Sequence, residues 1–389
     1  MEKYFCNFSW EYLKLKKGSV GLVNDQSIEF KEPLKLQHGD ILPSYTLQIE
    51  TYGRLNKDKT NAILICHALS GNHHAAGKYH EDDPKPGWWD YFIGPNCCID
   101  TNCFFVVNSN NLGGCNGSTG PLSTNPRTGK VYGPDFPCVT VLDWVHAQAR
   151  LADYLGIYCW AAIIGGSLGG MQALQWSISY PERLKATVLI AAAPKLSAQN
   201  IAFNEVARQA IMRDPNFENG YYASKNQKPL KGLGLARMVG HITYLSDIAM
   251  KHKFDRSLPH EEHDIGTAHF AIEQYLARQG KRFGDNFDAN TYILMTRALD
   301  YFDPAETDAN KSLSEVLKCT KCKFLVLSFQ SDWRFPPERS QEIVNALLEA
   351  RSPVTYACIS SDAGHDAFLM PNTIYEKTLN AFLTNLKEF

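Results

Sequence analysis

The chain has 389 residues, of which 44% are hydrophobic and 21% charged, and its formal net charge at pH 7 is −2. This composition excludes a largely disordered chain, and the scattered Lys and Arg residues form no basic stripe for nucleic acid. We read no signal peptide at the start and no run near the roughly 20 apolar residues that cross a bilayer, so we expect no membrane segment. The 11 cysteines show no disulfide framework, and we therefore expect a cytoplasmic protein.

Six short runs rich in β-branched and aromatic residues predict strands that are buried on both faces. These runs are Ala62–Cys66, Phe104–Asn108, Trp160–Ile164, Thr187–Ile190, Phe324–Ser328 and Val354–Ile359. Helix-like stretches separate several of them, including Leu142–Leu155 and Leu168–Ser179. The alternation of strand and helix predicts an α/β fold with a mostly parallel sheet flanked by helices.

The alternation fails between about Pro194 and Asn310, and strands resume at Phe324. Four stretches in that interval have helical patterns without intervening strands: Phe203–Met212, Leu233–Met250, Ala268–Gln279 and Ala289–Tyr301. We therefore expect a core formed by residues 1–193 and 311–389, with a helical cap (lid) inserted at residues 194–310.

The segment from Asn110 to Pro137 contains six Gly and four Pro and has no periodicity, which predicts a loop. Ordered loops of this length are uncommon and usually functional, and a mobile surface loop is the alternative.

The strongest local motif places Ser167 in Gly165-Gly-Ser-Leu-Gly169, between a predicted strand and a predicted helix. In that setting the G-x-S-x-G pattern is typical of a sharp turn that exposes a nucleophilic serine at the end of a sheet. A glycine-rich turn that only packs the helix on the strand, or cradles a phosphate, is the structural alternative.

A serine nucleophile needs a base, and the base needs an orienting acid. Asp332 follows the predicted strand that begins at Phe324, and His365 follows the next one, so both should emerge at the same sheet edge as Ser167. The chain order Ser, Asp, His is that of α/β hydrolases. Asp362 is a weaker candidate for the acid, because it lies only three residues before His365 on the same loop.

An oxyanion also needs hydrogen-bond donors, for which we predict the backbone N–H groups of Leu168, after the nucleophile, and Leu69, in the turn after Ala62–Cys66. The nearby histidines could suggest a metal site, but they lack a metalloprotease motif, so we predict structural roles and no metal: His67, His73, His74 and His80. The lone Cys319-x-x-Cys322 pair is assigned no function.

With these residues in view, the chain resembles the homoserine O-acyltransferases of methionine biosynthesis, which have the α/β-hydrolase fold. The resemblance runs from about Leu36 to Leu386 and is most specific in five stretches: Asn111–Pro121, Asn125–Pro137, Gly165–Trp176, Arg237–Ser246 and Gly364–Leu369. Departures from the family pattern are mild. Leu168 stands where methionine is common, and Asn116 and Ser118 stand in place of chemically similar residues.

The resemblance implies a ping-pong reaction in which Ser167 takes an acyl group from acyl-CoA and passes it to the hydroxyl of homoserine. It implies that Arg237 binds the carboxylate of homoserine and Asp366 the ammonium; by itself, Arg237 would be read as a solvated helix residue. It also implies a homodimer formed through the cap helices, with acyl-CoA as co-substrate and no resident cofactor.

The acyl donor depends on Arg334, two residues after the predicted acid. An arginine here suits the free carboxylate of a succinyl group and resembles the substitution associated with succinyl specificity in the family, so we expect succinyl-CoA. Acetyl-CoA is the alternative donor. In that case Arg334 would only form an ion pair with Asp332 or with a surface carboxylate. An esterase or thioesterase, or an inactive binding module on this fold, would be the rival classes.

Overall fold

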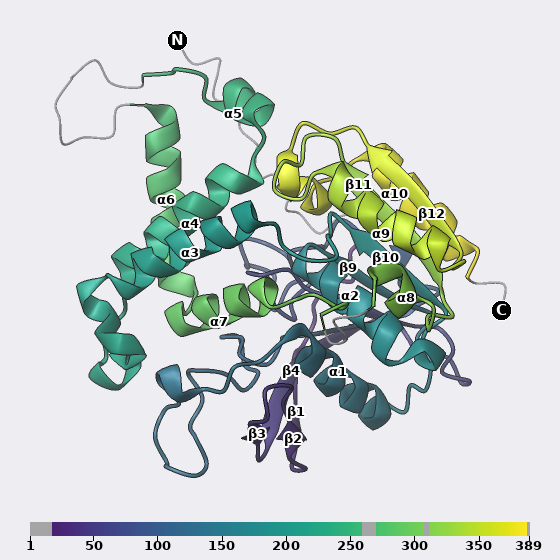
Figure 1. Cartoon of the computed structure of the whole chain (residues 1–389), viewed down its shortest axis with the longest axis horizontal. Helices are drawn as coiled ribbons and strands as arrows, with labels where there is room; N and C mark the ends of the chain where they lie inside the picture. The colour runs from purple at the N-terminus through teal and green to yellow at the C-terminus, as the bar shows by residue number, and fades with distance from the viewer. Residues whose placement is uncertain (1–17, 259–269, 307–310, 387–389) are drawn as a thin grey trace.

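The computed structural model describes residues 18–258, 270–306 and 311–386, and one eight-stranded sheet forms its core (Figure 1). The strands of this sheet are β1 (Gln26–Phe30), β4 (Tyr45–Tyr52), β5 (Ala62–Cys66), β8 (Phe105–Ser109), β9 (Ala162–Gly166), β10 (Ala186–Ile190), β11 (Lys323–Phe329) and β12 (Val354–Ile359). They lie in the order β1-β4-β8-β5-β9-β10-β11-β12. The strands from β8 to the β12 edge run parallel, and β4 is antiparallel to both of its neighbours. The mostly parallel sheet is therefore confirmed.

All six predicted runs are strands of this sheet, and β5, β9 and β10 are buried at every position. The expectation of burial on both faces is wrong for β12, in which Thr355 and Cys358 are exposed. β12 is the outermost strand, with a neighbour on one side only, and is therefore less completely covered. β1 and β4 were not predicted.

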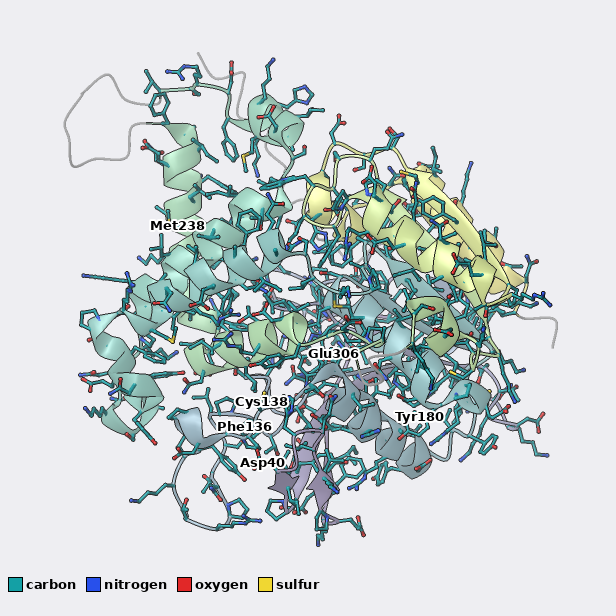
Figure 2. All side chains as sticks on the ribbon, viewed as in Figure 1. Asp40, Phe136, Cys138, Tyr180, Met238 and Glu306 are labelled. Atoms are coloured by element: carbon teal, nitrogen blue, oxygen red, sulfur yellow. The ribbon has the colours of Figure 1, made fainter. Side chains whose placement is uncertain are left out.

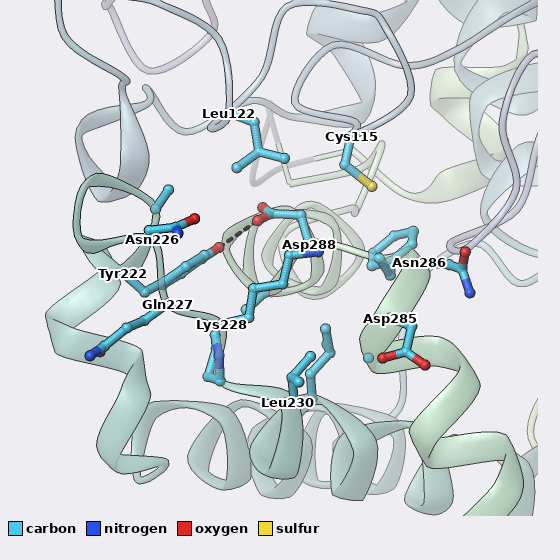
Figure 3. A pocket seen from close by; sticks show the side chains of 16 residues that line it. Cys115, Leu122, Tyr222, Asn226, Gln227, Lys228, Leu230, Asp285, Asn286 and Asp288 are labelled. Carbon is cyan, nitrogen blue, oxygen red and sulfur yellow. Dashed lines mark hydrogen bonds between the residues drawn. The ribbon is translucent and has the colours of Figure 1, made fainter.

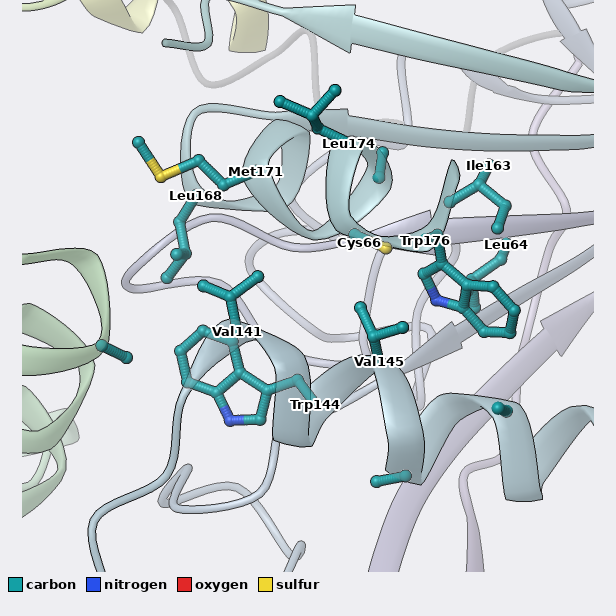
Figure 4. Packing of buried hydrophobic residues seen from close by; sticks show 14 of the residues in the cluster. Leu64, Cys66, Val141, Trp144, Val145, Ile163, Leu168, Met171, Leu174 and Trp176 are labelled. Carbon is teal, nitrogen blue, oxygen red and sulfur yellow. The ribbon is translucent and has the colours of Figure 1, made fainter. Parts of the chain in front are cut away.

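Helices cover both faces of the sheet (Figure 1). They are α1 (Val141–Leu155), α2 (Leu168–Ser179), α8 (Leu313–Leu317), α9 (Pro337–Glu349) and α10 (Thr373–Thr384). Apolar side chains of α1, α2 and α9 share one buried cluster, whereas those of α10 belong to a second cluster on the opposite face. Figure 4 shows part of the first cluster, in which Trp144 of α1 and Trp176 of α2 pack with Cys66 of β5.

The interval between β10 and β11 contains helices and no strand among its described residues. The helices of this predicted cap are α3 (Ala198–Met212), α4 (Leu230–Tyr244), α5 (Asp247–Lys253), α6 (Ala271–Asn286) and α7 (Ala289–Asp300). They lie to one side of the sheet in Figure 1. The single helix expected over Leu233–Met250 is wrong: Leu245 is extended, and Ser246 begins α5 by accepting a hydrogen bond from the Ala249 N–H.

Short elements complete the described chain. They are β2 (Leu34–Lys35), β3 (Ile41–Leu42), β6 (Ile93–Gly94), β7 (Ile99–Asp100) and the 3₁₀ helices η2 (Gly133–Asp135), η3 (Pro181–Arg183), η4 (Pro215–Gly220), η5 (Tyr222–Lys225) and η6 (Gly364–Leu369). The segment from Asn110 to Pro137 contains only η2 and an isolated bridge between Thr124 and Val131. No described helix is long and apolar enough to cross a membrane. Residues 1–17, where we read no signal peptide, and Ala268 and His269 of a predicted helix lie outside the described residues.

Candidate active site

Ser167 occupies a strained turn between β9 and α2. Its backbone has φ 56° and ψ −122°, a conformation that L-residues rarely adopt. The Ser167 N–H donates a hydrogen bond to the Ile190 carbonyl at 2.9 Å, which ties the turn to β10. A β-carbon on Gly165 would lie 2.0 Å from the Gly169 carbonyl oxygen, so the turn can close this tightly only with glycine there. The motif therefore forms the strand-turn-helix geometry that places a serine at the carboxyl end of a strand.

Ser167, His365 and Asp332 form one hydrogen-bonded line. His365 Nε2 lies 2.9 Å from Ser167 Oγ, and His365 Nδ1 lies 2.7 Å from Asp332 Oδ2. All three side chains are buried. Asp332 Oδ1 accepts hydrogen bonds from the N–H groups of Arg334 and Phe335. These two bonds hold the carboxylate in place while its other oxygen, Oδ2, orients His365. An imidazole so placed can accept the serine proton as the oxygen attacks a carbonyl.

The turn after β5 lies beside the start of α2, as an oxyanion site requires. A β-carbon on Gly169 would lie 2.0 Å from the Cys66 carbonyl oxygen, and Gln172 Nε2 donates to the His67 carbonyl at 3.2 Å. Leu168 is the first residue of α2, where backbone N–H groups have no partner within the helix. Among the described residues, neither the Leu168 nor the Leu69 N–H donates a hydrogen bond. The N–H groups of Leu168 and Leu69 therefore remain the predicted oxyanion donors.

Arg237 and Asp366 belong to two different elements near the triad, α4 and η6. Arg237, on α4, donates from Nη1 to Ser70 Oγ at 3.3 Å, and its guanidinium lies 4.7 Å from the centre of the Phe283 ring. Asp366 follows His365 directly in η6. Burial raises the pKa of the Asp366 carboxyl, while the charges of His365, Arg237 and Lys253 act in the opposite direction. The cation of Arg237 and the anion of Asp366 therefore interact electrostatically next to His365.

Lys253, at the end of α5, is a charged neighbour that sequence reasoning missed. Burial lowers the pKa of its ammonium, the nearby Arg278 adds to this, and Asp366 opposes it. The lysine amine lies 4.5 Å from the centre of the Tyr275 ring. Lys253 and Asp366 influence each other only through their charges. The two residues lie far apart in the sequence, and no spacing pattern connects them.

Tyr244, the last residue of α4, was also missed. Its ring centre lies 5.7 Å from the Arg237 guanidinium, 5.3 Å from that of Arg334, and 6.1 Å from the His365 ring. Tyr244 thus stands between two arginines and against the base. Its seven-residue spacing from Arg237 along one helix is the signal that could have revealed it.

Arg334 is buried, and its guanidinium contacts neutral groups. Nη1 donates to Thr243 Oγ1 at 2.7 Å and Nη2 to Asn204 Oδ1 at 3.1 Å. Only the Arg334 backbone N–H contacts Asp332. Within the described chain, no carboxylate forms an ion pair with this guanidinium.

The four clustered histidines have other surroundings. Burial lowers the pKa of His67 to about 4, and its Nε2 accepts a hydrogen bond from the Asn111 N–H at 3.0 Å. His74 Nδ1 lies 3.0 Å from Glu50, and His73 Nε2 lies 3.5 Å from Asp25. His80 is exposed. No group of three or more His, Cys, Asp or Glu is arranged for a metal ion in residues 18–258, 270–306 and 311–386.

Asp362 and the Cys319-x-x-Cys322 pair remain outside the site. Asp362 is exposed, and His365 bonds instead to Asp332. Cys319 is exposed whereas Cys322 is buried, with its sulfur 3.2 Å from Thr187 Oγ1. Every cysteine that the structure describes is a free thiol.

A cavity of about 590 Å³ opens between the cap and the loop that contains Cys115 (Figure 3). Tyr222 donates a hydrogen bond to Asp288 at 2.5 Å in its wall. The apolar wall of the cavity includes Leu233 and Phe287. These two residues belong to one buried cluster, and Leu69 and Phe283 pack against that cluster. The triad residues are not part of the cavity's described lining.

The parallel sheet, the serine turn and the hydrogen-bonded Ser-His-Asp line together define an α/β hydrolase with the apparatus for acyl transfer through a serine. Residues 61–370 match the α/β hydrolase fold family. Homoserine O-succinyltransferases of Marinobacter nauticus and Stutzerimonas stutzeri are 61% and 60% identical over 370 residues, each match covering 95% of this chain and 97% of the relative. The chain belongs to the homoserine O-acyltransferase family, which confirms the resemblance.

Solved structures agree with this assignment. The crystal structure of a homoserine O-acetyltransferase from Bacillus anthracis superposes with a TM-score of 0.87 at 30% identity, covering 93% of this chain and 98% of that one. The structure of esterase E22 superposes with a TM-score of 0.85 at 32% identity, covering 93% and 100%. The same fold thus serves proteins named for transfer and for hydrolysis, so the residues of the site, not the fold, determine the acceptor.

Proposed function

We propose that this protein is a homoserine O-succinyltransferase, which moves the succinyl group of succinyl-CoA to the hydroxyl of L-homoserine in methionine biosynthesis. The single observation that carries the choice of donor is the buried guanidinium of Arg334, which meets Thr243 and Asn204 and no carboxylate among the described residues. The names of relatives at about 60% identity support the same activity.

The first half-reaction acylates the serine. Ser167 Oγ attacks the thioester carbonyl while His365 Nε2 takes the hydroxyl proton, and the N–H groups of Leu69 and Leu168 stabilise the oxyanion. Collapse breaks the carbon–sulfur bond, and His365 returns the proton to the leaving CoA thiolate. The products of this step are free CoA and a succinyl ester on Ser167.

The second half-reaction transfers the acyl group. His365 takes the proton of the homoserine hydroxyl, the oxygen attacks the Ser167 ester, and the proton returns to Ser167 Oγ as O-succinylhomoserine leaves. Arg237 suits the carboxylate of homoserine because a guanidinium can form paired hydrogen bonds, and Asp366 suits the ammonium. Acyl-CoA is a co-substrate in this cycle, and we assign the protein no resident cofactor or metal.

Succinyl-CoA is favoured over acetyl-CoA by charge. A succinyl thioester has a free carboxylate, whereas an acetyl group has nothing that a cation can bind. A buried cation without an anionic partner is costly, because burial removes its hydration. Binding of the succinyl carboxylate at Arg334 would offset that cost, and binding of an acetyl group would not.

We also infer that the protein is a cytoplasmic homodimer, joined through the cap helices. Leu235 and Ile242 on α4 are 50% and 45% exposed, and Met238, labelled in Figure 2, lies between them at helical spacing. A contiguous apolar stripe of this kind favours burial against a second copy. The free thiols of the described cysteines are in keeping with a reducing compartment.

The decisive experiment is a side-by-side assay of succinyl-CoA and acetyl-CoA with homoserine and serine, and without an acceptor. We expect O-succinylhomoserine as the main product and a succinyl adduct on Ser167 by mass spectrometry when the acceptor is omitted. Hydrolysis of acyl-CoA at one rate, with or without homoserine, would indicate an esterase or thioesterase. A preference for acetyl-CoA would indicate the acetyltransferase, and the absence of any acyl-enzyme would indicate a binding module.

A further inference from the structure

One face of α3 holds Arg334 in place. Asn200, Asn204 and Arg208 follow one another at intervals of four residues, so they form a single stripe along the helix, and all three are buried. Asn200 Nδ2 donates to the Arg334 carbonyl oxygen at 2.8 Å, and Asn204 Oδ1 accepts from the guanidinium at 3.1 Å. α3 therefore forms hydrogen bonds with both the backbone and the guanidinium of Arg334.

The orientation of the Asn204 amide is fixed by its second partner. Asn204 Nδ2 donates to Asp300 Oδ1 at 2.8 Å. A carboxylate can only accept and a guanidinium can only donate, so the amide must present nitrogen to Asp300 and oxygen to Arg334. Asp300 thus sets which end of Asn204 meets Arg334.

The charge of Asp300 is balanced without Arg334. Asp300 Oδ2 lies 2.7 Å from Arg208 Nη1, and Arg208 Nη2 lies 3.0 Å from Glu205. Arg297 is 3.9 Å from both Asp300 and Glu205. This cluster pairs two cations with two anions, so it has no anionic charge left for the neighbouring Arg334.

We propose that Asn204, oriented by Asp300, is a specificity-determining positioning residue, which fixes the Arg334 guanidinium through a neutral acceptor and so leaves its charge for the carboxylate of the acyl donor. The inference rests on the proposed succinyl transfer and adds to it. An aspartate at position 204 would form an ion pair with Arg334 and compete with the succinyl carboxylate. An apolar residue there would leave Nη2 without its partner and the guanidinium held only through Thr243 and Tyr244.

A charge-swap variant tests this directly. Asn204→Asp combined with Asp300→Asn keeps the net charge and the contact between the two positions, but it places the carboxylate against Arg334. We expect the ratio of kcat/KM for succinyl-CoA over acetyl-CoA to fall roughly 10- to 100-fold, the range for a charged hydrogen bond. The kcat/KM for acetyl-CoA should stay within about threefold, because acetyl makes no use of the guanidinium.

Asn204→Leu provides the test if the swap variant does not fold, and its ratio should fall about tenfold. Gln199→Leu, on the exposed side of the same helix, is the matched control and should leave the ratio unchanged. In an Arg334→Leu background the swap should no longer move the ratio, since the guanidinium is gone. Melting temperatures measured in parallel identify a loss of folding.

The outcomes separate the inference from the proposed function. If the wild-type protein does not prefer succinyl-CoA, the proposed donor is wrong and the inference falls with it. If the wild type prefers succinyl-CoA but the folded Asn204 variants lower both donors equally, Asn204 is only structural and the inference alone is overturned. The inference alone is also overturned if the Asn204→Asp/Asp300→Asn swap changes the succinyl-CoA to acetyl-CoA ratio in the Arg334→Leu background.

Discussion

The carbonyl oxygen of Cys66 occupies the space that a β-carbon on Gly169 would need, with only 2.0 Å between them. This close approach brings the start of α2 against the end of β5, and with it the two proposed oxyanion donors, Leu168 and Leu69. The glycine at this position of the motif therefore serves the proposed oxyanion site as well as the packing of a helix on a strand.

Gly169→Ala should lower both stability and turnover. The methyl group must push α2 away from β5, which costs about 1–3 kcal/mol as overpacking and moves Leu168 from Leu69. We expect a lower melting temperature and a fall in kcat that exceeds the change in KM for acyl-CoA. Gly284→Ala is the control: its new β-carbon would lie 3.3 Å from the Leu230 carbonyl oxygen, a tight contact that needs a far smaller shift, so both quantities should change less. Unchanged kcat in a folded Gly169→Ala protein would contradict this account of the site.

Asp332→Asn should lower kcat by roughly 10²- to 10⁴-fold, because an amide can hold His365 with the proton on the wrong nitrogen. The Arg334 and Phe335 N–H groups can still bind the remaining side-chain oxygen, so the loop should stay in place. The rate of succinyl-enzyme formation, followed by mass spectrometry, measures the effect at the first half-reaction. Wild-type rates in this variant would leave Asp332 without the proposed role.

Asp366→Asn should raise the KM for homoserine roughly 10- to 100-fold while leaving succinyl-enzyme formation unchanged, because only the acceptor has an ammonium. Burial raises the pKa of Asp366, so the wild-type carboxyl gains its proton at a higher pH than an exposed aspartate. The KM for homoserine should therefore rise as the pH falls, and this dependence should be absent in Asp366→Asn.

Asp362→Asn is the matched control for this variant, since Asp362 lies on the same loop and is exposed. It should keep both the wild-type KM and its pH dependence. An Asp366→Asn protein that slowed acylation as much as transfer would indicate a role at the triad, not at the acceptor.

Much of the fold and the triad could be predicted because the signals are local. Buried parallel strands have continuous apolar runs, and their carboxyl ends share one edge, so residues following three runs had to meet there. β4 has no continuous apolar run, because polar residues alternate with apolar ones along it. Two of these polar residues, Gln48 and Glu50, are nonetheless buried and hydrogen-bonded. A buried polar residue reads as a solvent-facing one in sequence.

The contacts that position the site could not be predicted, because they join elements far apart in the chain. Asn204 and Arg334 are 130 residues apart and meet only through the packing of α3 near the loop after β11. The break between α4 and α5 did have a local signal, a capping serine at Ser246 followed by Asp247. The apolar periodicity on either side of it concealed that signal.

Arg334→Leu should raise the use of acetyl-CoA relative to succinyl-CoA. Leucine fills part of the buried volume but offers nothing to a carboxylate, so kcat/KM for succinyl-CoA should fall roughly 10- to 100-fold. Arg334→Lys retains the charge without the fork and should give an intermediate ratio. Arg213→Leu, an exposed arginine at the end of α3, should leave the ratio at the wild-type value. An unchanged ratio in Arg334→Leu would show that another residue selects the donor.

The buried His67 should make the protein sensitive to mild acid. Burial lowers its pKa from 6.5 to about 4, so the folded protein keeps it neutral while the unfolded chain binds a proton below 6.5. This stability is fully present above pH 6.5 and is lost as the pH falls to about 4, at a cost on the order of 3 kcal/mol. His67→Gln, which can still accept from the Asn111 N–H, should flatten the decline in unfolding free energy measured with urea between these pH values. His80→Gln, at an exposed position, should retain the wild-type slope, and an equal slope in all three proteins would assign the acid sensitivity to other groups.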